Sequence, residues 1–192
     1  MKLELIDLPS YMTKAEQFEP EFEQFIAILK RENVKSYLEI GSKNGGSLWR
    51  VANALPKGSC VVSVDLPHGD GGTKQSLVEC CGALDGLGYR VHLFLNDSTD
   101  LEVINAVKNH GPFDACFIDA NHTEPYVRQD WANYGPMCRI VAFHDIAWKK
   151  EKRVGRLPIE VPKVWDEIKA SYRYEEISLR PDDNGIGVLW RR

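Results

Sequence analysis

The chain has 192 residues, of which 43% are hydrophobic and 27% are charged, close to the composition of an average globular domain. This composition excludes collagen-like, coiled-coil and intrinsically disordered proteins, and the length fits a single domain, residues 1–192, that buries a core without disulfides or metal ions. A formal net charge of −4 argues against a surface built to neutralise the phosphates of nucleic acid.

Residues 1–35 are expected to form an N-terminal helical segment that packs on the rest of the domain. Its apolar residues recur at the spacing of one helix face: Phe22, Phe25, Ile26 and Leu29. Residues 1–19 are partly acidic and contain no apolar run long enough for a signal peptide or a membrane helix. We therefore expect a cytoplasmic protein that has no membrane partner.

From residue 36 onward, apolar runs alternate with segments of helical periodicity. The expected strands are Ser36–Ile40, Cys60–Asp65, Tyr89–Leu95, Phe113–Asp119 and Cys138–Phe143. The expected helices cover 48–55, 77–84, 99–109 and 123–134; Thr99 and Glu102 are spaced as a capping box, and Thr123 is the expected N-cap of the last. Such alternation predicts a parallel sheet with helices on both faces.

The regular alternation of strands and helices ends after Asp145. A basic stretch without periodicity, residues 149–156, precedes a helix near 164–171 and two strands, 174–178 and 186–190. No helix separates the last two strands, so they are expected to be antiparallel. The fold class is therefore α/β, Rossmann-like and doubly wound, with a mostly parallel seven-stranded sheet and an antiparallel C-terminal strand.

The five cysteines are expected to be reduced and mostly buried. They are odd in number and show no CxxC spacing, and Cys60 and Cys116 lie in apolar, strand-like runs. A zinc site or a disulfide framework is therefore not expected.

A glycine-containing loop, residues 39–47, closes the first strand and opens a helix. Ligands of open α/β sheets bind at the carboxyl ends of the strands, so this position indicates a cofactor loop. The loop is not a P-loop, because no Gly-Lys-Ser/Thr follows it, and it lacks the GxGxxG spacing of a dinucleotide site.

Two acidic residues follow the next two strands. Asp65 lies about 20 residues after the glycines, where its carboxylate can accept hydrogen bonds from both hydroxyls of an unmodified adenosine ribose. Asp97 follows the third strand and can accept from an adenine amino group; alternatively, Ser98 or Thr99 simply caps the next helix.

The ordered set Glu39-x-Gly41-x-x-x-Gly45, Asp65 and Asp97-Ser98 resembles the successive motifs of class I S-adenosylmethionine-dependent methyltransferases. Four further stretches indicate a particular subfamily within this class: Phe117-Ile-Asp119-Ala-Asn-His122, Phe143-His144-Asp145, Val161-Pro-Lys-Val-Trp165 and Gly185-Ile-Gly-Val-Leu189. Over residues 36–190 the chain is similar to a small-molecule subfamily related to macrolide-sugar O-methyltransferases and cephalosporin-hydroxylase-like proteins.

This resemblance implies S-adenosylmethionine as the cofactor and a small molecule as the methyl acceptor. The implied cofactor-binding residues are Glu39, Gly41, Gly45, Asp65, Asp97, Ser98 and Asp119. Gly41 and Gly45 would face the methionine part, and Glu39 would hold the loop or the methionine amine. Enzymes that methylate DNA amino groups carry Asn/Asp-Pro-Pro-aromatic after the fourth strand, whereas this chain has Asp119-Ala-Asn-His122, which disfavours nucleic-acid acceptors.

Methyl transfer from a sulfonium is an in-line displacement, so a hydroxyl acceptor needs a base, a metal ion or both. His122 and His144 follow strands and are the candidate catalytic bases. Asp119 and Asp145 are the candidate ligands of a divalent cation, with Mg²⁺ the expected ion. In related sugar O-methyltransferases an acidic pair follows the fifth strand; His144 replaces its first acid here, so a metal-free mechanism remains the alternative.

Two other functions share parts of this pattern. A nicotinamide-dependent Rossmann oxidoreductase has the strand, the glycine loop and the acidic residue, but normally needs GxGxxG. A noncatalytic S-adenosylmethionine-binding module needs only the first half of the chain. The basic stretch at 149–156 could fold over an anionic acceptor or form a solvated loop.

Overall fold

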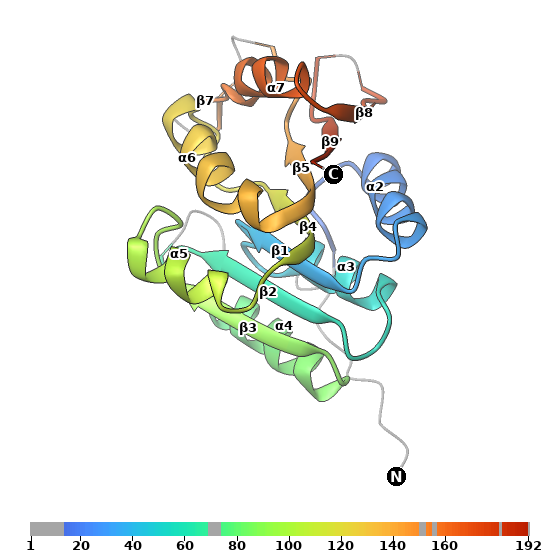
Figure 1. Cartoon of the computed structure of the whole chain (residues 1–192), viewed down its shortest axis with the longest axis vertical. Helices are drawn as coiled ribbons and strands as arrows, with labels where there is room; N and C mark the ends of the chain where they lie inside the picture. The colour runs from blue at the N-terminus through green and yellow to red at the C-terminus, as the bar shows by residue number, and fades with distance from the viewer. Residues whose placement is uncertain (1–13, 69–73, 150–152, 155–156, 181, 192) are drawn as a thin grey trace.

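The computed structural model describes residues 14–68, 74–149, 153–154, 157–180 and 182–191. A seven-stranded sheet in the order β3-β2-β1-β4-β5-β9-β8 forms its centre (Figure 1). The strands are β1 Ser36–Ile40, β2 Cys60–Asp65, β3 Arg90–Leu95, β4 Phe113–Ile118, β5 Cys138–His144, β8 Arg173–Ile177 and β9 Ile186–Trp190. Strands β1 to β5 are parallel, and β9 is antiparallel to both β5 and β8. The predicted fold class is confirmed.

Helices cover both faces of the sheet (Figure 1). On one face lie α2 Glu19–Arg31, α3 Gly46–Ala54 and α4 Lys74–Gly86. On the other lie α5 Leu101–Lys108, α6 Glu124–Tyr134 and α7 Val161–Lys169. A short 3₁₀ helix, Gly135–Met137, follows α6. The two-residue strands β6 Arg153–Val154 and β7 Leu157–Pro158 pair with each other; β6 lies in the stretch without periodicity and β7 directly after it.

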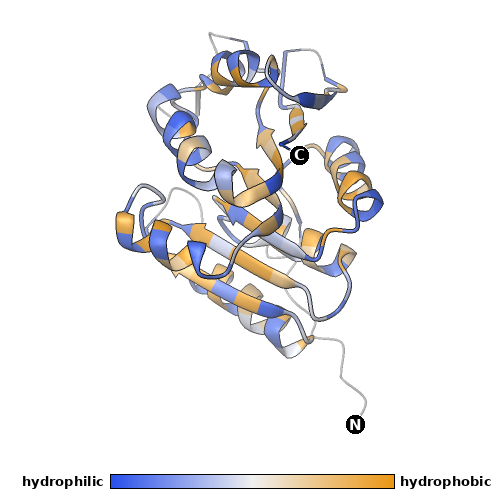
Figure 2. Cartoon of the chain, in the orientation of Figure 1, coloured by the Kyte–Doolittle hydropathy of each residue, from blue (hydrophilic) through white to orange (hydrophobic). Residues whose placement is uncertain are grey.

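The core consists of two layers because side chains alternate along each strand. Tyr37, Val61 and Phe117 point to the α2–α4 side, whereas Leu38 and Val62 point to the α5–α7 side. Strands buried on both faces are mostly apolar along their length, and in Figure 2 much of the central strands has the hydrophobic colour.

The start of α5 differs from the sequence expectation. The N-cap is Asp100, whose side chain accepts from the Glu102 backbone N–H at 2.8 Å, so the capping box predicted from Thr99 and Glu102 is wrong. Thr99 instead donates its hydroxyl to Asp97 at 2.7 Å. At α6, Thr123 occupies the N-cap position but donates its hydroxyl to Asn121.

The strand order reverses between β1 and β4, which brings the loops after these strands together. The Asp119 backbone N–H donates to the Ile40 carbonyl at 2.9 Å. Gly41, at φ +91°, makes this approach possible: a Cβ there would lie 2.3 Å from the Asp119 carbonyl oxygen. The loops that follow β1 and β4 are therefore in direct contact.

Helix α2 is joined to the C-terminal strands by a buried carboxylate. Glu21, fully buried, accepts hydrogen bonds from the backbone N–H groups of Leu179 at 2.7 Å, Arg180 at 3.3 Å and Gly185 at 3.0 Å. Phe25 of the same helix stacks on Phe117 of β4. The N-terminal helix thus rests on the sheet and holds the β8–β9 connection.

All five cysteines are free and buried, as predicted. Among the described residues, no helix combines the length and apolar character needed to cross a membrane.

Candidate active site

The glycine loop turns sharply between β1 and α3. Gly45 is the N-cap of α3 at φ +91°, and its backbone N–H donates to the Ser42 carbonyl at 2.7 Å. A Cβ at Gly45 would lie 2.7 Å from the Cys80 sulfur of α4. Glycine is therefore required here by conformation and by helix packing, and its expected contact with the methionine part stays a prediction.

Glu39 lies beneath the loop, fully buried on β1. Tyr37 and Ser47 each donate a hydroxyl hydrogen bond of 2.7 Å to its carboxylate. Burial raises the pKa of Glu39 to about 7, although these hydrogen bonds work in the opposite direction. Its contacts tie β1 to the first turn of α3, so in this structure Glu39 holds the loop. Contact with the methionine amine, the other expected role, stays a prediction.

Asp65 and Asp97 follow β2 and β3 at the same edge of the sheet. Asp65 accepts from the Lys43 backbone N–H and, at 2.7 Å, from the Lys74 ammonium. One oxygen of Asp97 accepts from both the backbone N–H and the hydroxyl of Thr99. Nothing in the sequence singled out Lys74, which is the first residue of α4.

Helix α6 supports the loop after β3. The Tyr134 hydroxyl donates to the Ser98 carbonyl at 2.7 Å. Asp130, one turn earlier and fully buried, also lies near Ser98; burial raises its pKa to about 7. Sequence reasoning assigned neither residue a role, because both occupy positions typical of an ordinary amphipathic helix.

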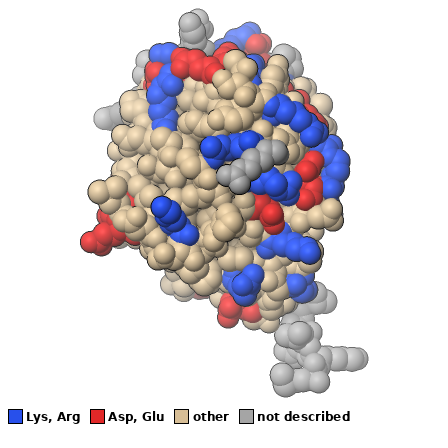
Figure 3. All heavy atoms as spheres, viewed as in Figure 1, with Lys and Arg blue, Asp and Glu red and all other residues tan. Residues whose placement is uncertain are grey.

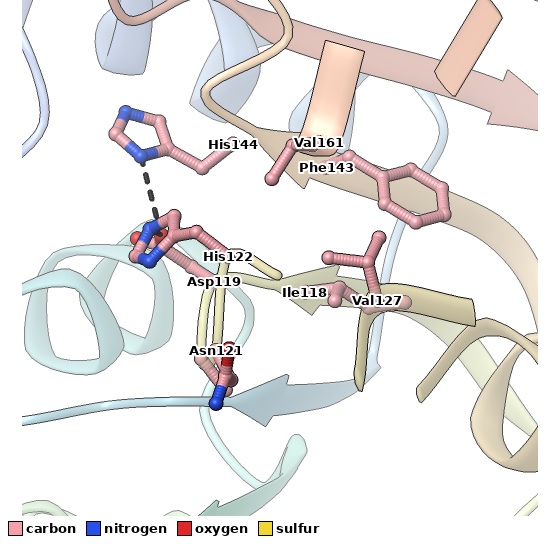
Figure 4. Close-up of a pocket in the computed structure, with 9 residues that line it drawn as sticks. Ile118, Asp119, Asn121, His122, Val127, Phe143, His144 and Val161 are labelled. Atoms are coloured by element: carbon pink, nitrogen blue, oxygen red, sulfur yellow. Dashed lines mark hydrogen bonds and ion pairs between the residues drawn. The ribbon is translucent and has the colours of Figure 1, made fainter. Parts of the chain in front are cut away.

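Asp119, His122, His144 and Asp145 converge after β4 and β5; we call them the quartet. One ligand-type atom from each lies within 4.8 Å of all the others. His122 Nε2 lies 2.8 Å from Asp145 and 3.5 Å from Asp119, and His144 Nδ1 lies 3.2 Å from each carboxylate. Figure 4 shows both rings beside Asp119. The sequence placed these residues on one rim, and the structure brings all four together.

Two side chains outside the quartet hold its carboxylates. Gln17, from the segment before α2, donates its amide to Asp119 at 2.5 Å, and the Trp148 indole donates to Asp145. Asp145 itself has a left-handed backbone at φ +61°, an uncommon conformation for a residue other than glycine. The sequence carried no signal for Gln17, which is 102 positions from Asp119.

The charges of the quartet stabilise one another. Burial alone would lower the pKa of both histidines, but the two carboxylates raise it to about 9 for His122 and about 10 for His144. Burial likewise opposes ionisation of Asp119 and Asp145, yet the histidines hold the pKa of both carboxyls below the usual value. In the chain without a bound ion, both rings are therefore positively charged imidazolium groups at neutral pH.

The stability of the metal-free chain is expected to fall as the pH rises from about 6.5 to about 10. Each folded-state histidine pKa exceeds the unfolded value of about 6.5, so the stabilisation is complete below that pH and is lost as the pH passes through about 9 for His122 and about 10 for His144. The expected loss is on the order of 3 kcal/mol from His122 alone, with a further loss from His144, measured by urea unfolding in EDTA. A flat profile over this interval would contradict the ion pairing.

Two cavities border this region. A small one of about 10 Å³, room for about one water molecule, touches Asp119, His122 and His144 and is lined on its other side by the apolar side chains labelled in Figure 4. A larger one of about 560 Å³ is lined mostly by polar and charged side chains: Lys14, Glu16, Gln17, Glu19, Asn44, Arg180 and Asn184. Gln17 connects the two, since it lines the larger cavity and contacts Asp119.

The quartet fits Mg²⁺ poorly. Mg²⁺ takes oxygen ligands in a near-ideal octahedron, whereas two of the four groups here are imidazoles. That Asp119 and Asp145 hold a metal ion stays a prediction; the expectation of Mg²⁺ does not agree with the donor atoms.

Comparison with known proteins identifies one matching family, described as a methyltransferase domain, over residues 38–146. The match runs from β1 to the residue after Asp145, so it includes the glycine loop, Asp65, Asp97 and the quartet. No curated protein matches the chain in sequence.

Solved structures with the same fold include two O-methyltransferases. The O-methyltransferase TomG from Streptomyces achromogenes, in complex with S-adenosylmethionine, has a TM-score of 0.68 at 17% identity and covers 89% of this chain and 79% of its own. An O-methyltransferase from Bacillus cereus, in complex with S-adenosylhomocysteine, has a TM-score of 0.68 at 15% identity, with 96% and 85% covered. At these identities the likeness shows a shared fold.

Proposed function

The chain belongs to the methyltransferase-domain family, and we propose that it transfers the methyl group of S-adenosylmethionine to a hydroxyl of a small molecule. The observation that carries the proposal is the arrangement along one edge of the sheet. The glycine loop, Asp65 and Asp97 follow β1 to β3, and the quartet follows β4 and β5. Two O-methyltransferases of the same fold, one in complex with S-adenosylmethionine and one with S-adenosylhomocysteine, support this choice.

The first three strand ends are proposed to hold the cofactor. The backbone at Gly41 and Gly45 would face the methionine part, Asp65 the ribose hydroxyls, and Asp97 with Ser98 the adenine. Ligands of open sheets bind beside the point where strand order reverses, which lies between β1 and β4. The sulfonium would then lie near Asp119, which borders both the cofactor side and the quartet.

The quartet is proposed to activate the acceptor hydroxyl. An in-line displacement needs the acceptor oxygen aligned and free of its proton. His122 is the more exposed ring, with 20% of its side chain accessible against 9% for His144, so we propose that it lies nearest the acceptor. Because its pKa is raised to about 9, His122 would accept a proton directly only in alkaline solution unless its partners change.

The acceptor is proposed to be a polar small molecule that enters the cavity of about 560 Å³, a volume typical of ligand pockets. On the face shown in Figure 3, basic side chains lie beside acidic ones, and the net charge is −4. Both features favour a small molecule over nucleic acid, whose binding relies on clustered Lys and Arg. We also propose a cytoplasmic location, in line with the absence of a membrane-spanning helix in the described chain.

Calorimetric titration with S-adenosylmethionine and with NAD tests the choice of cofactor. We expect binding of S-adenosylmethionine alone; binding of NAD alone would favour an oxidoreductase. Methyl-donor turnover with a panel of hydroxylated sugars, phenols and polyketides then tests catalysis. Cofactor binding without turnover on any acceptor would favour a noncatalytic binding module.

Asp65→Ala is expected to weaken S-adenosylmethionine binding by about 1.5 to 3 kcal/mol, or about 10- to 150-fold, because the ribose loses charge-assisted hydrogen bonds. Asp65→Asn should also weaken it, since the amide keeps the size of the side chain but not its charge. Asp85→Ala, an exposed acid at the end of α4, is the control. Equal dissociation constants for Asp65→Ala and the wild type would remove the ribose assignment.

A further inference from the structure

We infer that the quartet is a binding site for a divalent transition-metal ion of the imidazole-accepting class, such as Co²⁺ or Zn²⁺, in preference to Mg²⁺. The inference deepens the proposed function by naming the ion at its acceptor end. It rests on the geometry and the donor atoms of Asp119, His122, His144 and Asp145.

The spacing of the four groups matches a first coordination shell. An ion with nitrogen and oxygen ligands at about 2.0 to 2.1 Å in a tetrahedron holds those atoms about 3.3 Å apart. The four nitrogen-to-oxygen separations in the quartet, counting either oxygen of Asp145, are 2.8, 3.2, 3.2 and 3.5 Å. Little movement of these side chains is therefore needed to surround one ion.

The type of donor selects the class of ion. Two imidazoles and two carboxylates form a mixed nitrogen and oxygen set, which suits zinc and its neighbours among the first-row metals. Mg²⁺ and Ca²⁺ would leave half of this set poorly used, because they prefer oxygen. When both rings are neutral, the two carboxylates carry a charge of −2, which balances the +2 charge of one divalent ion.

Groups around the quartet orient its members. Gln17 and Trp148 each donate a hydrogen bond to one carboxylate, as the groups that orient the ligands do in metal sites. The ring of His144 is nine-tenths buried, and within the described residues its only hydrogen-bonding partners are the two carboxylates, since its Nε2 has none. The left-handed backbone of Asp145 turns its carboxylate toward both rings; such strain at a polar cluster is typical of functional sites.

The space beside the quartet admits one small occupant. The cavity of about 10 Å³ that borders Asp119, His122 and His144 is too small for the cofactor or the acceptor. In the loaded state both rings would be ligands, so neither would be a free base.

The test is a metal titration of the full chain after EDTA treatment and dialysis. Calorimetry with CoCl₂, ZnCl₂ and MgCl₂ is expected to give one Co²⁺ or Zn²⁺ per chain and at least tenfold weaker Mg²⁺ binding. Bound Co²⁺ should also give visible absorption bands of a low-coordinate site. S-adenosylmethionine binding, measured in parallel, reports on the proposed function separately.

Four variants assign the site. His122→Ala and His144→Ala should each weaken Co²⁺ binding by at least about 100-fold, because the loss of a group that only hydrogen-bonds to a ligand already costs up to about that much. His110→Ala, which removes a histidine stacked on His92 of β3, should bind as the wild type does. His144→Asp replaces a nitrogen ligand by oxygen and should shift the preference toward Mg²⁺.

Mg²⁺ binding as tight as Co²⁺ binding overturns the inference, and so does the absence of binding by either ion. Co²⁺ binding that survives in both His122→Ala and His144→Ala would place the ion elsewhere. Each variant must retain wild-type circular dichroism, and His144→Asp remains informative if either alanine variant fails to fold.

Discussion

His122→Ala is expected to lower methyl transfer by about 10²- to 10⁴-fold, the range for removing a group that assists proton transfer. His122 lies 2.8 Å from Asp145 and is the more exposed ring of the quartet, so its loss removes the group nearest the proposed acceptor. The expectation holds whether the ring takes the proton itself or holds an ion. Initial rates at saturating S-adenosylmethionine with a competent acceptor measure it.

His122→Gln separates chemistry from structure. The glutamine amide can still donate a hydrogen bond toward Asp145, but it cannot accept a proton at neutral pH. We expect this variant to be nearly as inactive as His122→Ala while it binds S-adenosylmethionine as tightly as the wild type. Full turnover in either variant would exclude His122 from the reaction, and His110→Ala serves as the active control.

Gly41→Ala is expected to destabilise the protein by about 3 to 5 kcal/mol, a large part of the stability of a typical domain. Two costs add: a side chain at φ +91°, and a Cβ 2.3 Å from the Asp119 carbonyl oxygen. Relief of that contact requires separation of the loops after β1 and β4. Cofactor binding should therefore be lost together with stability, as measured by urea unfolding and calorimetry.

Gly88→Ala is the matched control for this prediction. Gly88 has φ +90°, almost the same as Gly41, but a Cβ there would meet nothing within 4 Å. Gly88→Ala should lower the free energy of unfolding only by the cost of a side chain at positive φ, about 1 to 2 kcal/mol. Equal losses in the two variants would show that the contact between the β1 and β4 loops contributes nothing.

The strands were more predictable from sequence than the helix ends. Ser36–Ile40, Cys60–Asp65 and Ile186–Trp190 have the expected bounds, because strands buried on both faces are mostly apolar along their length and so stand out in the sequence. The start of α5 was not predictable in the same way. Thr99 and Asp100 compete for neighbouring backbone N–H groups, and side-chain geometry decides that Asp100 caps the helix.

The candidate site was predictable in its position but not in its connections. Parallel strands end at one edge, so placing Asp119 and His144 at the ends of β4 and β5 sufficed to bring them together. That each ring lies between both carboxylates depends on the left-handed backbone of Asp145 and on Gln17, an uncharged residue far away in sequence. Lys74, next to Asp65, was missed for the same reason: its partner is chosen by the fold.

Glu21 has a consequence for the order in which the chain folds during synthesis. Helix α2 leaves the ribosome before its partners, because the backbone N–H groups that its carboxylate binds belong to residues made more than 150 positions later. Strand β9, inserted between β5 and β8, is likewise made long after α2. Until those residues are made, the Glu21 carboxylate stays hydrated and part of the apolar face of α2 stays uncovered. The nascent chain therefore cannot complete its fold before β8 and β9 are made, and it exposes this apolar face to chaperones until then.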